Sequence, residues 1–334
     1  MTSPMASASS AGSRTCSTRT TMTRSASRRR GSGPMPAFAC RCDIVAARGG
    51  RWAIARLFMI LLAVLASVSG GAVAAPPPAR VVSLNLCLDQ LALVLAAPGQ
   101  LVGVGDVSQD RHLSARWREA RSLPAVRMRI EEVLALRPDL VLLDSYAPPH
   151  MAALLGRAGV RVELFPEAVT FDDGVARVRA IAAALGRESA GTALADDMRR
   201  RLAGLGADKQ DTPRPLAAVW QANGFTVSSG TLPDDLLRRA GFRNLAAERG
   251  LGPFAPLPLE VLVRAAPDLL ILDGSTSERP SLAEALMTHR AARHAFGETR
   301  TLVMPHSLWL CAGPPNLEAL DRLVAMRNAI EHRR

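Results

Sequence analysis

One stretch of this chain occurs twice and constrains the fold more than any other feature. The first copy is Glu131–Asp144, EEVLALRPDLVLLD, and the second is Glu260–Asp273, EVLVRAAPDLLILD. In each copy a Glu stands seven residues before a Pro-Asp pair. Proline cannot continue a helix, so a short helix ends there and the aliphatic run after it is typical of a buried parallel strand. A repeat this widely spaced predicts two similar lobes rather than an array.

The segments around each copy alternate between strand and helix patterns, which predicts an α/β lobe with a mostly parallel sheet in each half. Strands are expected over residues 80–84, 101–104, 140–143, 161–165, 216–220, 269–272 and 301–304. Helices are expected over residues 88–96, 114–120, 150–158, 233–240, 281–296 and 317–331.

Between the lobes the alternation stops. Phe171–Leu205 contains no strand-like run, only Ala, Arg, Leu and Asp at helical spacing, so one connecting helix of about 30 Å or more is expected. Gly186 and Gly191 are positions where it could bend. The predicted domains are a first lobe over 79–170, a connecting helix over 171–207 and a second lobe over 213–331.

The net charge of +11 suggests a nucleic-acid-binding protein at first sight, but the excess is local. Ten of the 41 Lys and Arg residues are Arg within residues 1–56, where Asp43 is the only acid, leaving 31 basic against 29 acidic residues elsewhere. Residues 1–50 are rich in Ser, Thr and Arg, which predicts a disordered basic leader or a start codon assigned too early. The nucleic-acid interpretation therefore loses its support.

Residues 51–74 have the pattern of a signal peptide. Arg51 and Arg56 precede the apolar run Leu57–Val68, and small residues follow, so cleavage is expected after Ala74 and the mature chain in the periplasm. The alternative is a retained membrane anchor, although the run is shorter than the ~20 residues needed to span a bilayer.

Two cysteines, Cys87 and Cys311, remain beyond the predicted cleavage site, one in each lobe. An even number in an oxidising compartment suggests a disulfide between the lobes. Two free thiols lining a ligand site, and inert packing, are the alternatives.

The motifs RVVSLN, EEVLALRPDLVLL and EVLVRAAPDLLIL together resemble those of the class III periplasmic binding proteins, over about Arg80 to Ala329. The resemblance implies a carrier with two α/β lobes joined by a long rigid helix. It also implies a ligand held between the lobes, namely an iron–siderophore complex, haem or vitamin B12, and delivery to the permease dimer of an ABC importer in the inner membrane. The family has no intrinsic cofactor.

In this family one Glu on each lobe pairs with Arg pockets on the two permease subunits. Those glutamates lie seven residues before the Pro of each repeat, which gives Glu131 and Glu260 that role here. An anion is also favoured in the first turn of a helix, so capping without any partner is the simpler interpretation. Glu132 could substitute in the first lobe.

The ligand site is expected where the carboxyl ends of the parallel strands meet. The candidate residues are Asn85, Cys87, Asp106, Arg127, Arg129, Tyr146, Trp220, Gln221, Phe225, His306, Trp309 and Cys311. Rings at strand ends suit a large flat ligand, with core packing as the alternative, and Arg127 and Arg129 suit carboxylates or phosphate if they are not simply solvated. Val107 and Ala125–Val126 stand where cobalamin carriers are expected to have Tyr and Trp, which favours a ferric siderophore or haem.

No nucleophile elbow, phosphate-binding loop or HExxH motif is present, so an enzyme is not expected. The runner-up from another class is a chelatase-like enzyme, for which His306 with Asp106 is the best catalytic pair. A third interpretation is an extracytoplasmic sensor or interaction module. The six His residues have no spacing that suggests metal ligands on one helix face.

Overall fold

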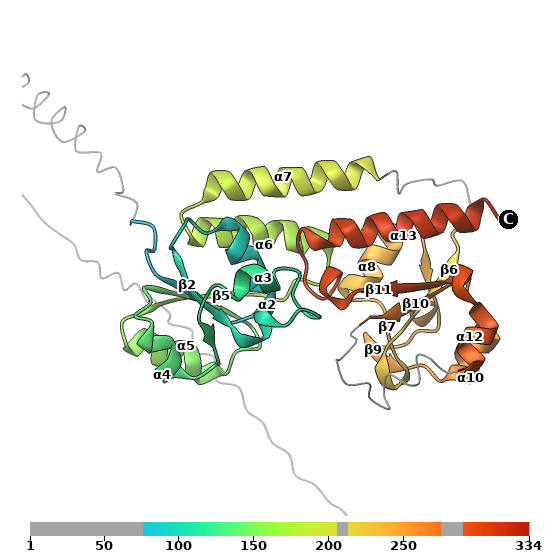
Figure 1. Cartoon of the computed structure of the whole chain (residues 1–334), viewed down its shortest axis with the longest axis horizontal. Helices are drawn as coiled ribbons and strands as arrows, with labels where there is room; N and C mark the ends of the chain where they lie inside the picture. Colours follow the sequence, from blue (N-terminus) through green and yellow to red (C-terminus); the bar gives the residue numbers. More distant parts are fainter. Residues whose placement is uncertain (1–75, 206–212, 275–289, 334) are drawn as a thin grey trace, which may run out of the picture. The chain divides into compact units, whose positions relative to one another are not determined.

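The computed structural model describes residues 76–205, 213–274 and 290–333 (Figure 1). The predicted leader, the predicted signal peptide and most of the predicted helix 281–296 lie outside these ranges. In the described part of the chain, no helix combines the length and apolar character needed to cross a bilayer.

The first lobe is built on a five-stranded parallel sheet in the order β3-β2-β1-β4-β5. Its strands are β1 (Val81–Ser83), β2 (Leu101–Gly105), β3 (Ala125–Val126), β4 (Leu140–Asp144) and β5 (Arg161–Phe165). Every residue of β4 is buried, as expected for the apolar run of the first repeat copy. The short strand β3 is not among the strands expected from the sequence.

Helices and turns connect these strands. They are α2 (Leu86–Leu95), η1 (Asp106–Gln109), α3 (Trp117–Ala120), α4 (Ile130–Ala135) and α5 (Pro149–Arg157). Helix α2 begins after Asn85 because the side-chain oxygen of Asn85 accepts the N–H groups of Cys87 and Leu88. Helix α4 ends just before Pro138, as the repeat predicts.

The aspartate after the proline of each repeat accepts hydrogen bonds from the backbone at the start of the first strand of its lobe. Asp139 accepts the backbone N–H groups of Ala79 and Arg80 at 2.7 and 3.0 Å. Asp268 accepts the N–H of Leu216 at 2.8 Å. The Pro-Asp pair therefore combines a helix stop with an anchor for the first strand of the sheet.

The second lobe has a four-stranded parallel sheet, β11-β10-β6-β8, and a separate antiparallel pair, β7-β9. The strands are β6 (Leu216–Trp220), β7 (Phe225–Val227), β8 (Arg243–Asn244), β9 (Phe254–Pro256), β10 (Leu269–Asp273) and β11 (Thr301–Met304). The helices and turns are η2 (Ala222–Gly224), α8 (Leu232–Arg239), α9 (Leu245–Glu248), α10 (Leu259–Ala265), α12 (Arg290–Phe296), η3 (Glu298–Arg300), η4 (His306–Leu308) and α13 (Pro315–Glu331).

The expectation of one connecting helix is wrong. The segment forms two helices, α6 (Phe171–Ala184) and α7 (Glu188–Gly204), which pack side by side (Figure 1). Gly186 ends α6 with φ +69°, and the N–H groups of Gly186 and Arg187 bond back to the last turn. Close packing of the pair requires Gly191, where a Cβ would lie 2.2 Å from the Ala182 Cβ.

Helix α6 contacts both lobes. At its start, the N–H of Phe171 donates to Asp235 Oδ2 of α8 at 2.9 Å, and Asp172 pairs with Arg239 at 2.8 Å. Near its end, the carbonyl of Leu185 accepts from Gln100 Nε2 of the first lobe at 2.8 Å. A short rigid helix therefore bridges the lobes.

Candidate functional site

The aspartate that closes each repeat holds an amide side chain from the neighbouring strand end. In the first lobe, Asn85 Nδ2 donates to Asp144 Oδ2 at 2.6 Å. In the second, Gln221 Nε2 donates to Asp273 Oδ2 at 2.6 Å. Both pairs lie at the carboxyl ends of parallel strands, so the predicted candidates Asn85 and Gln221 stand at equivalent places in the two lobes.

Tyr146 follows β4 and is 70% exposed. Its hydroxyl donates to the carboxylate of Glu167, and that hydrogen bond raises the pKa of the phenol. Nearby, the buried guanidinium of Arg177 donates to the carbonyl of Pro166, and burial lowers the pKa of Arg177. The ring of Tyr146 is thus available at the surface with its proton held.

His306 lies at the first position of η4, directly after β11. Its Nδ1 lies 2.8 and 2.9 Å from Oδ1 and Oδ2 of Asp273, whose side chain is buried. The chelatase hypothesis paired this histidine with Asp106, and the structure does not. Asp106 is exposed and accepts the N–H of Val107.

The two tryptophans expected to grip a ligand are core residues. Trp220 and Trp309 are both fully buried, and the Trp220 indole N–H donates to the carbonyl of Leu257 at 3.1 Å. Each side chain is part of a hydrophobic core cluster and is not available to a ligand at the surface. The alternative of core packing is therefore correct for both, and that expectation is withdrawn.

Two exposed aromatic residues remain in the second lobe. Phe225 is 43% exposed, and its carbonyl accepts the N–H of Gln221. Phe254, which the sequence analysis did not select, is 70% exposed on β9. Phe225 lies two residues from Val227, the register partner of Phe254, so both residues lie on one face of the antiparallel β7-β9 pair.

Arg127 and Arg129 are exposed and share one acidic neighbour. Arg127 Nε lies 3.5 Å from Glu132 Oε1, and an Arg129 nitrogen lies 4.0 Å from the same atom. Exposed ion pairs of this kind contribute little to stability and dissociate easily. Both guanidinium groups therefore remain accessible, and their ligand role stays a prediction.

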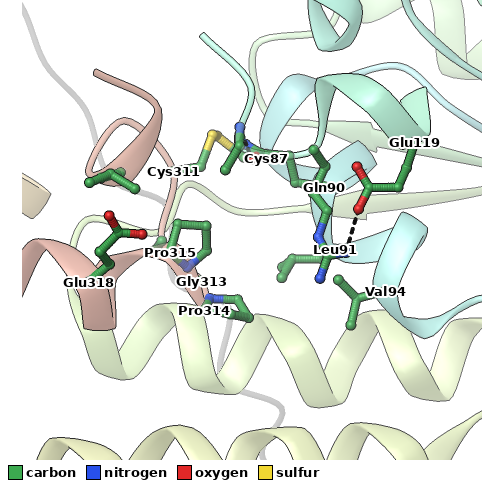
Figure 2. Close-up of a pocket in the computed structure, with 14 residues that line it drawn as sticks. Cys87, Gln90, Leu91, Val94, Glu119, Cys311, Gly313, Pro314, Pro315 and Glu318 are labelled. Carbon is green, nitrogen blue, oxygen red and sulfur yellow. Dashed lines mark hydrogen bonds and ion pairs between the residues drawn. A yellow bond between two sulfur atoms is a disulfide. The ribbon is translucent and has the colours of Figure 1, made fainter. Parts of the chain in front are cut away.

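Cys87 and Cys311 form a disulfide with a Cα–Cα distance of 5.1 Å. The bridge joins the first turn of α2 to the loop before α13, and so ties the lobes together. It borders a cavity of about 300 Å³ whose walls come from both lobes, including Leu91, Glu119 and Pro315 (Figure 2). The two cysteines are the predicted site residues that line this cavity.

A buried carboxyl, that of Asp89, lies two residues after Cys87 on α2. Asp89 Oδ2 accepts the Gly105 N–H at 2.9 Å and the Ser108 hydroxyl at 2.5 Å. Burial raises the pKa of the Asp89 carboxyl to about 7, against these hydrogen bonds, which favour ionisation. Asp89 thus holds the β2–η1 loop, beside the Asn85 end of the candidate site.

The two glutamates predicted to dock a permease are exposed in the first turns of α4 and α10. Among the described residues, no ion pair involves Glu131 or Glu260. The neighbouring Glu132 is instead engaged by Arg127 and Arg129. This geometry fits Glu131, and not Glu132, as the available anion of the first lobe.

The sequence model of the periplasmic binding proteins matches residues 81–296. The chain belongs to the periplasmic binding protein family. This periplasmic binding protein is accordingly a solute-binding protein and not an enzyme. The two lobes with parallel sheets agree with the predicted class III architecture.

A curated relative, a cobalamin-binding protein of Halobacterium salinarum, is 27% identical over 213 residues, which cover 63% of this chain and 58% of the relative. The match thus spans little more than half of that relative's length. A periplasmic haem-binding protein from Roseiflexus is 25% identical, with a TM-score of 0.64, over 75% of this chain and 98% of that one. One from Pseudomonas aeruginosa is 26% identical, with a TM-score of 0.62, over 75% and 92%.

Proposed function

We propose that this protein is the exported solute-binding component of an ABC importer and that it carries a metal tetrapyrrole, haem or a cobalamin. The family match supports binding of a solute. The relatives described above bind cobalamin or haem, which are both metal-centred macrocycles. This common chemistry favours a metal tetrapyrrole over the ferric siderophore that the sequence analysis also allowed.

The exposed rings at the strand ends are the observation on which the proposal rests. Tyr146 follows β4 in the first lobe, while Phe225 and Phe254 share one face of the β7-β9 pair in the second. A flat apolar macrocycle gains most from stacking against such rings, because aromatic side chains bury large areas at small entropic cost. Arg127 and Arg129 offer cations for the peripheral carboxylates of haem or the phosphate of cobalamin.

The test is an absorbance titration of the purified protein, residues 75–334, with haemin, cyanocobalamin, aquocobalamin and ferrichrome. We expect saturable binding of one macrocycle with micromolar or lower Kd, and about tenfold weaker binding by Tyr146→Ala or Phe254→Ala. The matched control is Leu154→Ala, since Leu154 is a partly exposed apolar residue on α5. Preference for ferrichrome, or no binding by a folded protein, would overturn the proposal.

We further propose that Glu131 and Glu260 dock the carrier onto the two permease subunits. Both are exposed anions at the same position of a repeated helix, one in each lobe. Two equivalent anions suit a partner with two equivalent cationic sites, and such charges mainly give steering and register.

A further inference from the structure

The disulfide forms part of the wall of the cavity where the two lobes meet. Cys87 and Cys311 both line this cavity, whose volume is about 300 Å³ (Figure 2). Sites for small molecules have volumes of roughly 300–1,000 Å³, so the cavity is large enough for a small one. Cys87 is partly exposed, whereas Cys311 is 5% exposed. A molecule in the cavity therefore reaches the sulfur of Cys87 more readily than that of Cys311.

Two carboxylates, Glu119 and Glu318, line the same cavity on opposite sides (Figure 2). Glu119 Oε1 lies 2.8 Å from Arg116 Nη1, and Glu318 Oε1 lies 2.7 Å from Arg322 Nη2. All four side chains are at least 36% exposed, so these ion pairs dissociate easily. A hydrogen bond from its own backbone lowers the pKa of Glu119, which is therefore ionised at neutral pH. Of the lining residues that the structure describes, only Arg116 is a cation, so carboxylates outnumber cations in the cavity wall.

A buried amide lies beside the disulfide in the same wall. Gln90 is 5% exposed, and its Oε1 accepts the N–H of Ala115 at 2.9 Å. Within the described ranges, Nε2 of Gln90 has no hydrogen-bond acceptor. Gln90 stands three residues after Cys87 on α2, so the two side chains are neighbours on one face of the helix. The free amide group can therefore donate to an anion that approaches the sulfur of Cys87.

The first turn of α2 also favours a negative charge near Cys87, because the helix dipole is positive at this end. The reactive form of a thiol is the thiolate, which is such an anion. A thiol that also carries a protonated amine would meet complementary groups at both ends. Its thiolate would lie near Gln90 and the start of α2, and its ammonium group near Glu119 or Glu318.

We propose that this cavity admits a small aminothiol, a thiol with a protonated amine, and that the disulfide is opened there by thiol–disulfide exchange. The thiolate attacks Sγ of Cys87 and forms a new S–S bond, while the bond to Cys311 breaks and the Cys311 sulfur leaves as a thiolate that takes up a proton. A second aminothiol molecule then releases Cys87 as a thiol, so two aminothiols are oxidised to their disulfide for one protein disulfide reduced. The lobes are afterwards joined by the polypeptide alone. This site goes beyond the proposed function and does not depend on it.

The experiment compares three thiols of similar size: cysteamine, which is positively charged, neutral mercaptoethanol, and negatively charged mercaptoacetate. Each reacts with the oxidised, ligand-free protein at neutral pH, and acid-quenched samples are followed by mass spectrometry. Each rate is divided by the rate of the same thiol with the disulfide of mercaptoethanol, which removes differences in intrinsic reactivity. We expect cysteamine to be at least about tenfold faster than mercaptoacetate on this scale, with mercaptoethanol between them, because opposite charges attract in the cavity. The first product should carry cysteamine on Cys87 and a free thiol on Cys311.

Variants test the groups in the cavity wall. Glu119→Gln combined with Glu318→Gln should reduce the preference for cysteamine over mercaptoacetate to about threefold or less, with little change for mercaptoethanol. The matched control is Glu188→Gln, since Glu188 is an exposed glutamate on α7 outside the cavity. Gln90→Glu keeps an acceptor for the Ala115 N–H but removes the free donor, so it should slow mercaptoethanol about threefold or more.

Two outcomes would overturn this inference. One is a set of equal corrected rates for the three thiols with the wild-type protein, which would mean that the cavity does not select among them. The other is a first mixed disulfide on Cys311 instead of Cys87. Neither result bears on the binding of a macrocycle, and a protein that binds no macrocycle would leave the thiol site standing.

Discussion

The two lobes use carboxylates in the same way at their repeated positions and in opposite ways in their first helices. Asp139 and Asp268 both anchor an opening strand. On α2, however, Asp89 is buried among neutral donors, and no described cation pairs with it. On α8, the buried Asp234 and Asp235 pair with Arg238 and Arg239, within 3.1 and 2.7 Å.

The comparison separates a feature that the shared architecture requires, the anchoring aspartate, from one that differs between the lobes, the surroundings of the carboxylates on the first helix. A strand entering a parallel sheet needs its first N–H groups satisfied, so both lobes keep that aspartate. The helix after the first strand has no such requirement. Burial without a neighbouring cation favours the protonated form of a carboxyl. A neighbouring cation favours the ionised form, which then forms an ion pair that stabilises the fold. In the first lobe, burial accordingly raises the pKa of the Asp89 carboxyl to about 7.

The largest expected effect tests whether the lobes contribute equally to docking. Glu131→Ala combined with Glu260→Ala should lower ligand uptake by cells at least tenfold, because both charges that orient the carrier are lost. Each single variant should have a similar, intermediate effect. The measurement is accumulation of labelled ligand in cells that carry the variant in place of the natural protein.

The matched control for docking is Glu188→Ala, since Glu188 is also exposed in the first turn of a helix, α7, but lies outside the repeat. The Kd for the ligand should be unchanged in all four proteins. Weaker ligand binding by the double variant would mean that these glutamates belong to the ligand site.

A second prediction concerns the disulfide between Cys87 and Cys311, and tests whether the two lobes unfold together only because it links them. Replacing Cys87 and Cys311 together by Ser should lower the free energy of unfolding by about 3–5 kcal/mol, because the crosslink closes a very long loop in the unfolded chain. The lobes should then unfold at separate denaturant concentrations. Urea titrations followed by circular dichroism measure this, with reduced wild-type protein as the control; an unchanged, single transition would contradict it.

The smallest predicted effect concerns the buried carboxyls themselves. Burial raises the pKa of Asp89 in the folded state to about 7, above its ordinary value of 3.8, so between these two pH values the native state holds a proton that the unfolded state releases. The contribution of Asp89 to the free energy of unfolding should therefore fall from about pH 4 to pH 7 and stay constant above. Asp89→Asn should remove this decrease and be more stable at pH 8 by roughly 1–4 kcal/mol.

Asp235→Asn is the matched variant in the second lobe. It removes charge from contacts with Arg238, Arg239 and the Phe171 N–H, so it should destabilise the protein by about 1–3 kcal/mol at neutral pH. Urea unfolding at pH 5, 6, 7 and 8 compares the two. Shifts of the same sign in both variants at pH 8 would refute the contrast between the lobes.

The sequence predicts the strands and the repeat well because proline stops and apolar runs are local signals. β4 and β10 occupy the positions expected from the repeat. The sequence marks Gly186 as a possible bend but does not predict that the helix ends there, because a glycine within a helical pattern is often tolerated. The β7-β9 pair is missed since its short strands are far apart in the chain and one ends in Pro256.

The candidate site is predicted only in outline. The chain order places Gln221 and His306 after strands, but the choice of Asp273 as their common partner depends on which strands are neighbours in the sheet. A ring at the end of a strand can face the core or the solvent, and the sequence does not say which. Trp220 is buried in the core, whereas Phe225 is 43% exposed. Phe254 had no signal, because a lone Phe near Gly and Pro suggests a loop.

The bridge between Cys87 and Cys311 also turns most of the polypeptide into a closed covalent ring. A protease that cuts one peptide bond inside this ring adds a water molecule but releases no fragment. The nicked protein therefore keeps both lobes, and with them Glu131 and Glu260, on a single molecule. Under the proposed docking of both lobes to one partner, a single backbone cut in the ring leaves both docking residues on the same molecule.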